Sequence, residues 1–375
     1  MKDLWTKTLE RIGRSPTRIE ATSSVMAIVC GLLFGLALML IVNPLEAFPG
    51  FFTVITGPFQ EGLRSLGNMF YFGVPIILTG LSVAFAFRTG LFNIGATGQL
   101  TMGALTAVYI GVNWGFLGPF HWVVAVLGAM LAGALWGAIP GLLKAFRNVH
   151  EVVTSIMLNY VAMYFNTMII MNFLYDFQAS RTAHPLPSAR LPVLFLQNIF
   201  PGSRINIGIF IAVFFVAITH ILLKKTTFGY ELKATGFSRD ASRYAGMNEK
   251  RNIVLAMVIA GAISGVAGAM MYLIPGRHLP YETILITEGF TGIAIALLGL
   301  SAPIGVMLAG LFYGALHQGG TYLQLYDFRP EIIDIIIAVI IYFSALSLFL
   351  QKIVKTFIDK RTKASMGLSE EVETR

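Results

Sequence analysis

The stretch "IVLAMVIAGAISGVAGAMMYLI" (Ile253–Ile274) decides the fold class, because it runs through 22 residues without a single charge. A helix of that length matches the thickness of a hydrocarbon core, about 30 Å. Val25–Val42 is a second run without charge. Runs of this kind predict an all-α, polytopic membrane protein.

Composition supports this class, since 56% of the 375 residues are hydrophobic and only 12% are charged. Soluble domains carry about a quarter charged residues. The single cysteine, Cys30, can form no internal disulfide. Ten spans are predicted, at about 25–42, 68–87, 91–112, 121–143, 152–173, 206–223, 252–274, 284–298, 303–316 and 331–350. The eighth and ninth are short enough to form a broken or re-entrant pair.

The distribution of basic residues predicts the orientation of these spans. If the N-terminus is cytoplasmic, 21 of the 27 Lys and Arg residues fall in cytoplasmic segments and six in external ones. This is the bias of the positive-inside rule. The resulting domains are an N-terminal cytoplasmic segment (1–24), a membrane domain (25–350) and a cytoplasmic tail (351–375). The net charge of +8 therefore reflects topology, and nucleic acid is not an expected partner.

A faint internal similarity suggests two related halves. "LFNIGATG" opens the third span from inside, and "GFTGIAIA" opens the eighth from outside. If spans 2–5 and 7–10 are related, the intervening sixth span makes them an inverted repeat. Inverted repeats of this kind bracket a transport path near the membrane midplane.

The longest internal cytoplasmic loop, 224–251, has the marks of a short helix. Ser238 can cap a helix from Arg239 to about Ala245, and Gly246 can end it in a left-handed conformation. Asp240 and Arg243 follow the order that the helix dipole favours. A solvated loop whose charges only serve the positive-inside bias is the alternative.

Four motifs in order identify a family resemblance: "AFAFRTGLFNIGATGQL" (Ala84–Leu100), "VHEVVTSIMLNY" (Val149–Tyr160), "GYELKATGFSRDASRYAGM" (Gly229–Met247) and "GFTGIAIALLG" (Gly289–Gly299). The chain resembles the permease subunits of bacterial ABC importers in the branched-chain amino acid and simple-sugar superfamily. The second motif and "RTGLFNIGATGQ" are most similar to the nucleoside-uptake branch.

The resemblance implies partners and a coupling site. A multi-pass subunit of the bacterial cell membrane would pair with a second, paralogous permease, dock on a cytoplasmic ABC ATPase and receive substrate from an extracellular binding lipoprotein. The 229–247 loop would carry the coupling helix. The residues expected to serve coupling are Glu231, Ser238, Arg239, Asp240, Arg243, Tyr244 and Gly246. ATP and Mg²⁺ would belong to the ATPase, since this chain has no G-x-x-x-x-G-K-[ST] motif and is expected to bind no cofactor.

Polar and aromatic residues within the spans are candidates for the substrate path. They are Phe92, Asn93, Gln99, Asn159, Asn166 and Phe290. Asn159 and Asn166 are seven residues apart and so share a helix face. Buried amides are costly in a membrane unless they are paired, so this face should look into protein or water. Hydrogen bonding between helices explains the same pattern, and that alternative stays open.

Other polar residues give no catalytic or metal site. Glu288 and Asp334 lie near the predicted outer boundary, where an interfacial role is expected, and His121, His278 and His317 lie at outer ends or loops. No nucleophile and base occur in a suitable pattern, so the chain is not expected to be an enzyme. The external loop 174–205 is a candidate docking surface for a substrate-delivery protein, with a plain connector as the alternative.

The function expected from sequence is uptake of nucleosides by alternating access, driven by a separate ATPase. Neutral donors, acceptors and aromatic rings suit a nucleoside, but they suit ribose or another simple sugar as well. An ion-coupled secondary transporter without an ATPase is the second alternative, with Glu288 or Asp334 as its coupling site.

Overall fold

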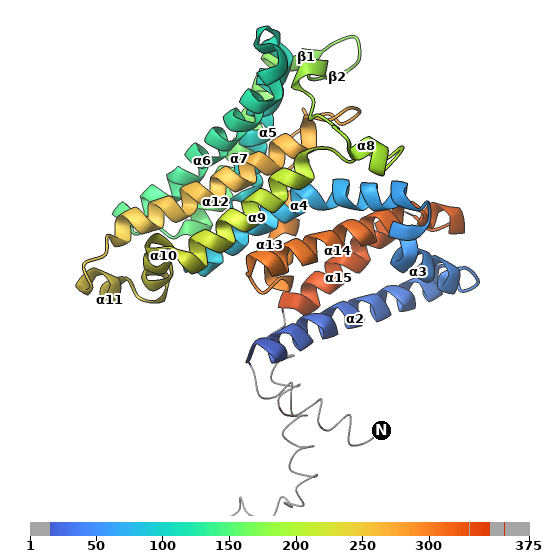
Figure 1. The fold of residues 1–375 in the computed structure, drawn as a ribbon, viewed down its shortest axis with the longest axis horizontal. Helices are drawn as coiled ribbons and strands as arrows, with labels where there is room; N and C mark the ends of the chain where they lie inside the picture. Colours follow the sequence, from blue (N-terminus) through green and yellow to red (C-terminus); the bar gives the residue numbers. More distant parts are fainter. Residues whose placement is uncertain (1–15, 330, 346–355, 357–375) are drawn as a thin grey trace, which may run out of the picture. The chain divides into compact units, whose positions relative to one another are not determined.

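Figure 1 shows the computed structural model, which describes residues 16–329, 331–345 and 356. The chain forms two compact units, one from the residues up to Phe52 and from Leu323 onward, the other from Thr53 to Tyr322. Most of the predicted N-terminal segment 1–24 and nearly all of the tail 351–375 lie outside the described residues.

The first unit is organised by two helices, α2 (Pro16–Val42) and α15 (Glu331–Ala345), with a short 3₁₀ helix at Leu323–Tyr326. Gly31 and Gly35 of α2 lie directly against Ile340 and Ile336 of α15, and a methyl group at either glycine would overlap the isoleucine. Because glycine has no side chain, the two helices can approach closely at these positions. The first predicted span is the later part of α2, which begins nine residues earlier than expected. The helix α3 (Ala47–Thr56), which contains the boundary between the units, was not predicted.

The second unit contains the long helices that correspond to spans two to seven and nine. They are α4 (Leu63–Arg88), α5 (Ala96–Asn113), α6 (His121–Arg147), α7 (Glu151–Ile169), α9 (Gly208–Lys225), α12 (Glu249–Tyr272) and α14 (Pro303–Thr321). Its shorter helices are α8 (Leu196–Ile199), α10 (Thr227–Phe237), α11 (Arg239–Tyr244) and α13 (Glu288–Leu298), with 3₁₀ turns at Gly57–Phe59, Gly115–Phe120 and Pro187–Ala189 and a π turn at Ile170–Leu174.

Over the residues that the structure describes, the fold is helical, as predicted, apart from one very short antiparallel pair. Strands β1 (Tyr175–Asp176) and β2 (Arg181–Thr182) pair with Tyr175 opposite Thr182. In the part of the chain that the structure describes, six helices are long and apolar enough to cross a membrane: α2 from Thr22, α4, α6 with the turn before it, α7 with the π turn after it, α9 and α12. The protein is therefore a multi-pass membrane protein.

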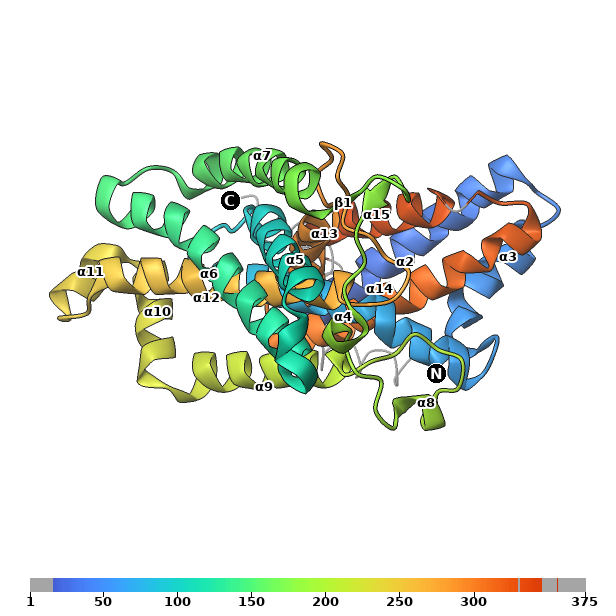
Figure 2. The same ribbon diagram turned by 90° about the horizontal axis from the view of Figure 1, so that it is seen from above.

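Glycines let the backbones of α12 and its neighbours touch. Gly261 and Gly265 of α12 face Gly133 and Gly137 of α6, which crosses α12 in Figure 2. Gly103 of α5 also lies against Gly265. A Cβ atom at these positions would overlap backbone atoms of the facing helix. The glycine-rich pattern of the opening stretch is therefore a packing surface, as small residues between membrane helices commonly are.

The helices α5 and α13 begin in the interior of the unit. Each starts later than predicted, at Ala96 and Glu288, because the residues before it are not helical. The first turns meet where Gly289 lies against Thr97, leaving no room for a side chain on the glycine. The carbonyl of Ala96 accepts a hydrogen bond from Ser264, which lies within the middle part of α12 (2.7 Å). The two helices are thus short elements whose N-termini meet partway along the long helices.

The first long helix of each half packs against the later helices of the other half, as an inverted repeat requires. The helix α4 packs against α13 and α14, and α12 packs against α5 and α6. This is the expected pattern if α4–α6 correspond to α12–α14. The last members of the repeat, α7 and α15, belong to different units, so the complete repeat of spans 2–5 and 7–10 stays a prediction.

Candidate functional site

The segment 224–251 folds into two short helices instead of the single one predicted. Figures 1 and 2 both show α10 and α11 at the end of the unit where α9 finishes and α12 begins. Thr226 caps α10, because its Oγ1 accepts a hydrogen bond from the backbone N–H of Gly229 (3.0 Å). A Ser or Thr at this position satisfies one of the free donors of the first turn. The segment is therefore ordered over most of its length.

The helix α11 has the caps that the sequence predicts. Ser238 Oγ accepts a hydrogen bond from the N–H of Ala241 (3.2 Å), and Gly246 adopts φ +79° just after the helix. Both local predictions are confirmed. Asp240 lies in the first turn and Arg243 in the last, and both are exposed. These charges agree with the helix dipole, with its positive end at the N-terminus.

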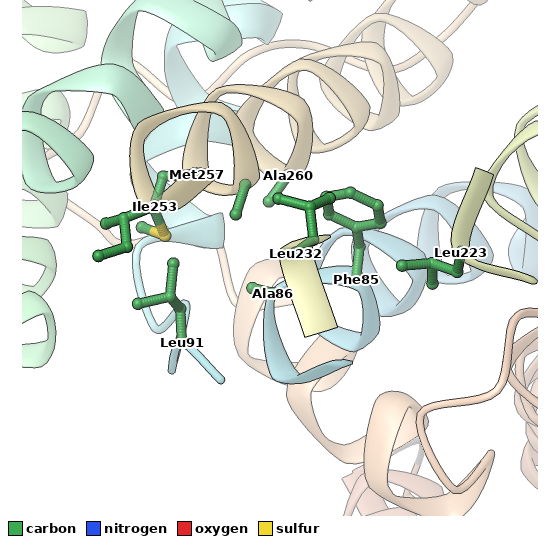
Figure 3. Close-up of a cluster of buried hydrophobic side chains, with 9 residues drawn as sticks. Phe85, Ala86, Leu91, Leu223, Leu232, Ile253, Met257 and Ala260 are labelled. Carbon is green, nitrogen blue, oxygen red and sulfur yellow. The ribbon is translucent and has the colours of Figure 1, made fainter. Parts of the chain in front are cut away.

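Leu232 packs the helix α10 against the core of the unit. Figure 3 shows this side chain, which is 1% exposed, among Phe85 and Ala86 of α4 and Met257 and Ala260 of α12. A buried leucine contributes about 1.5–3 kcal/mol through burial alone. A displacement of α10 therefore acts directly on the end of α4 and the first half of α12.

The predicted coupling residues divide into exposed and internally bonded ones. Tyr244 is 94% exposed, and so is Phe237 at 91%, a residue that the prediction left out. Arg239 instead donates to Asn148 Oδ1 (3.2 Å), and Glu231 accepts from Asn252 Nδ2 (3.5 Å). The signal for Phe237 was available in the sequence, where Phe237 and Tyr244 stand at the two ends of the predicted short helix. Contact with an ATPase stays a prediction for all of these residues.

The connection between α6 and α7 lies at the same end of the unit as α10 and α11. Asn148, the partner of Arg239, ends α6 in a left-handed conformation. Lys144 and Glu151 form a largely buried ion pair across this connection (2.7 Å). The contact of α11 with Asn148 therefore reaches α6 and α7 through a short, charge-paired turn.

The amides predicted for the substrate path are buried and bonded within the chain. Asn93 and Gln99 form two reciprocal hydrogen bonds, with Nδ2 to Oε1 at 2.9 Å and Nε2 to Oδ1 at 3.1 Å. Asn159 accepts from the N–H of Gly98 (2.8 Å) and donates to the carbonyl of Ile94 (3.0 Å). These bonds hold the non-helical residues before α5 and favour the packing alternative.

The remaining predicted path residues do not gather with the buried amides. Asn166 donates to the carbonyl of Pro280 (2.9 Å), away from the Asn93–Gln99 pair in sequence and in bonding. Phe92 is 39% exposed and stacks on Phe87 with ring centroids 5.1 Å apart. Phe290 is also partly exposed, in the first turn of α13. A substrate contact for these residues stays a prediction.

A cavity of about 290 Å³ lies between α4, the end of α12, the start of α13 and α14. Its charged lining residues are Glu288, Arg277 and Arg204. Arg277 Nη2 donates to the Glu288 carboxylate at 2.5 Å. Burial by itself would lower the pKa of the Arg277 guanidinium, but Glu288 and two nearby tyrosines raise it on balance, so Arg277 stays charged. Sequence reasoning found only Glu288 of this site, because the other lining residues come from separate segments.

The external loop 174–205 is tied to the connection between α12 and α13. Thr182 Oγ1 donates to the carbonyl of Leu279 (2.7 Å), and the rings of His184 and His278 lie 4.0 Å apart. Partial burial, then the charges of His278, Arg181 and Arg190, lower the pKa of His184. Docking of a delivery protein on this loop stays a prediction. Among the described residues, no group of three or more His, Cys, Asp or Glu side chains could hold a metal ion.

Comparison with known proteins agrees with this architecture. Residues 65–345 match the family described as "Branched-chain amino acid transport system / permease component". The guanosine ABC transporter permease protein NupP of Bacillus subtilis is 41% identical, over 86% of this chain and 92% of its own. The nucleoside ABC transporter permease protein NupB of Lactococcus lactis is 34% identical, over 87% and 91%.

A third relative is named for a different class of transported molecule. The glucose ABC transporter permease protein of Haloferax volcanii is 30% identical, over 90% of both chains. No solved structure matches the chain. The family match covers the described helices from α4 to α15, and with the two relatives above it shows that this chain belongs to the family of branched-chain amino acid transport system permease components.

Proposed function

We propose that this chain is one permease subunit of an ATP-driven importer that takes up nucleosides. The observation that carries the proposal is the helix α11, capped at both ends and flanked by the exposed rings of Phe237 and Tyr244. Exposed apolar surface that is concentrated in one place marks contact sites with another protein, and these two rings concentrate it on one short polar segment. The names of the relatives at 41% and 34% identity supply the nucleoside as cargo.

The topology of the proposed subunit has ten spans, with both termini in the cytoplasm. The four short or less apolar helices α5, α13, α14 and α15 complete the six long ones. The basic bias of the sequence supports a cytoplasmic position for α10 and α11, where an ATPase that holds ATP and Mg²⁺ can reach them. A second, paralogous permease and an extracellular binding lipoprotein complete the importer.

The proposed mechanism is alternating access, driven through α10. When the ATPase moves α11, Leu232 passes the displacement to α4 and α12. Helices α13 and α14 pack against α4, whereas helices α5 and α6 pack against α12. A change in the angle between α4 and α12 therefore moves two groups of helices against each other, as in transporters with inverted repeats.

A simple sugar is the second candidate cargo, because the relative from Haloferax volcanii is named for glucose. Competition experiments separate the two: excess unlabelled nucleoside abolishes uptake of a labelled nucleoside, and excess glucose or ribose leaves it unchanged. The ion-coupled alternative loses support, since the family is one of ABC permeases and Glu288 is occupied by Arg277.

The proposal is tested by the double substitution Phe237→Ala and Tyr244→Ala. Both side chains are almost fully exposed, so the permease should fold normally. We expect loss of ATPase co-purification and at least a tenfold fall in ATP-dependent nucleoside uptake. Phe116→Ala, which removes an 81% exposed ring before α6, is the matched control and should leave both measurements unchanged. Normal uptake by the double variant would contradict the proposed coupling.

A further inference from the structure

The cavity at the start of α13 has the composition of a small-molecule site. Its volume of about 290 Å³ is close to the lower end of the roughly 300–1,000 Å³ found for ligand pockets. Its floor is apolar, with Ile76 and Met271 almost fully buried. One wall is aromatic, because Phe72 and His317 lie with ring centroids 4.2 Å apart and Tyr313 is beside His317 at 5.9 Å. An apolar pocket with a few convergent polar groups is the usual form of such a site.

The polar groups of the cavity offer both donors and acceptors. Arg277 Nη2 donates to Glu288 Oε1, and the guanidinium lies over the ring of Tyr272 at 5.5 Å. Glu288 Oε2 also accepts a long hydrogen bond from Thr287 Oγ1 (3.5 Å). A guanidinium carries five N–H donors and a carboxylate about four acceptor positions, so each group can still bind a further partner. The side chains of Arg277 and Glu288 are 35% and 22% exposed, which leaves them accessible from the cavity.

We infer that this cavity binds the base of a nucleoside, an inference that rests on the proposed function. The flat ring would lie against the wall of Phe72, Tyr313 and His317. Its edge, which alternates donors and acceptors, would bond to Arg277 and Glu288 without separating them. A zwitterionic amino acid could use the same spare donors and acceptors, so the aromatic wall is what favours a flat heteroaromatic ring, and leucine serves as the competitor that separates the two. A sugar can also lay a C–H face on the aromatic wall, so competition by glucose separates these two classes of cargo.

The test measures binding of labelled guanosine to the purified complete transporter in the absence of the receptor lipoprotein. We expect saturable binding by the unmodified transporter. Phe72→Leu keeps much of the side-chain bulk but removes the ring, and it should raise Kd about fivefold or more, the lower end of what one base–aromatic stack contributes. Glu288→Gln should raise Kd by a similar factor, because a charged acceptor is lost. Unlabelled nucleosides should compete, whereas leucine and glucose should not.

A matched control uses a different ion pair. Glu61 pairs with Arg64 (3.0 Å) in an exposed position before α4, and Glu61→Gln should leave guanosine binding unchanged. Retained ATPase activity in each variant shows that the transporter has assembled. Absence of saturable guanosine binding, equal competition by leucine or glucose, or unchanged Kd in both Phe72→Leu and Glu288→Gln would overturn the inference.

The outcome is distinguishable from failure of the proposed function. If cells with the unmodified importer do not take up nucleosides, the proposed function itself is wrong. If those cells take up nucleosides normally, and the two cavity variants bind guanosine and transport it like the unmodified protein, only the assignment of this cavity is wrong.

Discussion

Substitutions in the Asn93–Gln99 amide pair distinguish a packing role of these two side chains from a role in the substrate path. The pair is almost fully buried, with Asn93 at 0% and Gln99 at 1% exposure. In Asn93→Ala, both polar atoms of the Gln99 amide lose the bonds that they make to Asn93. A buried polar group without a partner costs about 1–3 kcal/mol, so two such atoms predict a loss of about 2–6 kcal/mol.

The reciprocal variant should cost less. In Gln99→Ala, the Asn93 carbonyl loses its partner, but Nδ2 keeps a long hydrogen bond to Ser82 Oγ (3.4 Å). About 1–3 kcal/mol is expected, plus the effect of the shortened side chain. The double variant has neither amide, so it should be more stable than the sum of the two single effects predicts, by about 1–3 kcal/mol.

The measurement is a double-substitution cycle of unfolding free energies, obtained by denaturant titration of the purified transporter in mixed micelles. The free-energy changes of independent substitutions add to within about 0.5 kcal/mol. If the double variant equals the sum of the two single variants within that range, the reciprocal bonding is refuted. Nucleoside uptake is measured in parallel on the same variants. Full stability with a strongly reduced uptake would place the two amides on the substrate path after all.

Three further predictions concern the glycine contacts, the cap of α11 and the external loop. Gly265→Ala should lower the stability of the permease by about 1–3 kcal/mol or more, seen as a lower unfolding temperature, because the methyl group would overlap the Ala129 carbonyl; an unchanged temperature would contradict the contact. Ser238→Ala should cost about 1 kcal/mol of local helix stability, so amide exchange in α11 should become faster, and unchanged exchange would show that the cap is not needed. His184 has a lowered pKa in the folded loop, so the unfolded loop binds more protons and loop stability should fall as the pH drops below the ordinary value of 6.5. Limited proteolysis should therefore cut the loop faster at acidic pH, and His184→Gln should weaken this dependence.

The sequence predicted best the features that depend on neighbouring residues. The caps of α11 were predictable, since a cap needs only Ser238, Gly246 and the few residues between them. The start of α5 was not, because the apolar residues just before it resemble a helix in hydropathy. Hydrogen bonds from Asn159 and the Asn93–Gln99 pair make the non-helical path possible, and such bonds depend on helices far apart in sequence.

The cavity was beyond sequence reasoning for a related reason. Its lining side chains come from α4, α12, α13, α14 and the connections before α9 and after α12, and their convergence exists only in the folded chain. Glu288 stood out as an acid near the membrane, but its partner Arg277 lies eleven residues earlier, in a connection of no regular structure. The sequence therefore indicated a functional candidate without indicating what surrounds it.

The meeting of α5 and α13 at Thr97 and Gly289 has a consequence for ion leakage. The first turn of every helix carries a partial positive charge, about half an elementary charge, on its free N–H groups. Because the Glu288 carboxylate in the first turn of α13 is already paired with Arg277, two such ends together in the interior raise the energy of a sodium ion or a hydronium ion at that depth, as half-helices do in water channels. An uncharged cargo meets no such barrier. A carrier built this way can open and close around neutral molecules while the cell keeps its proton and sodium gradients.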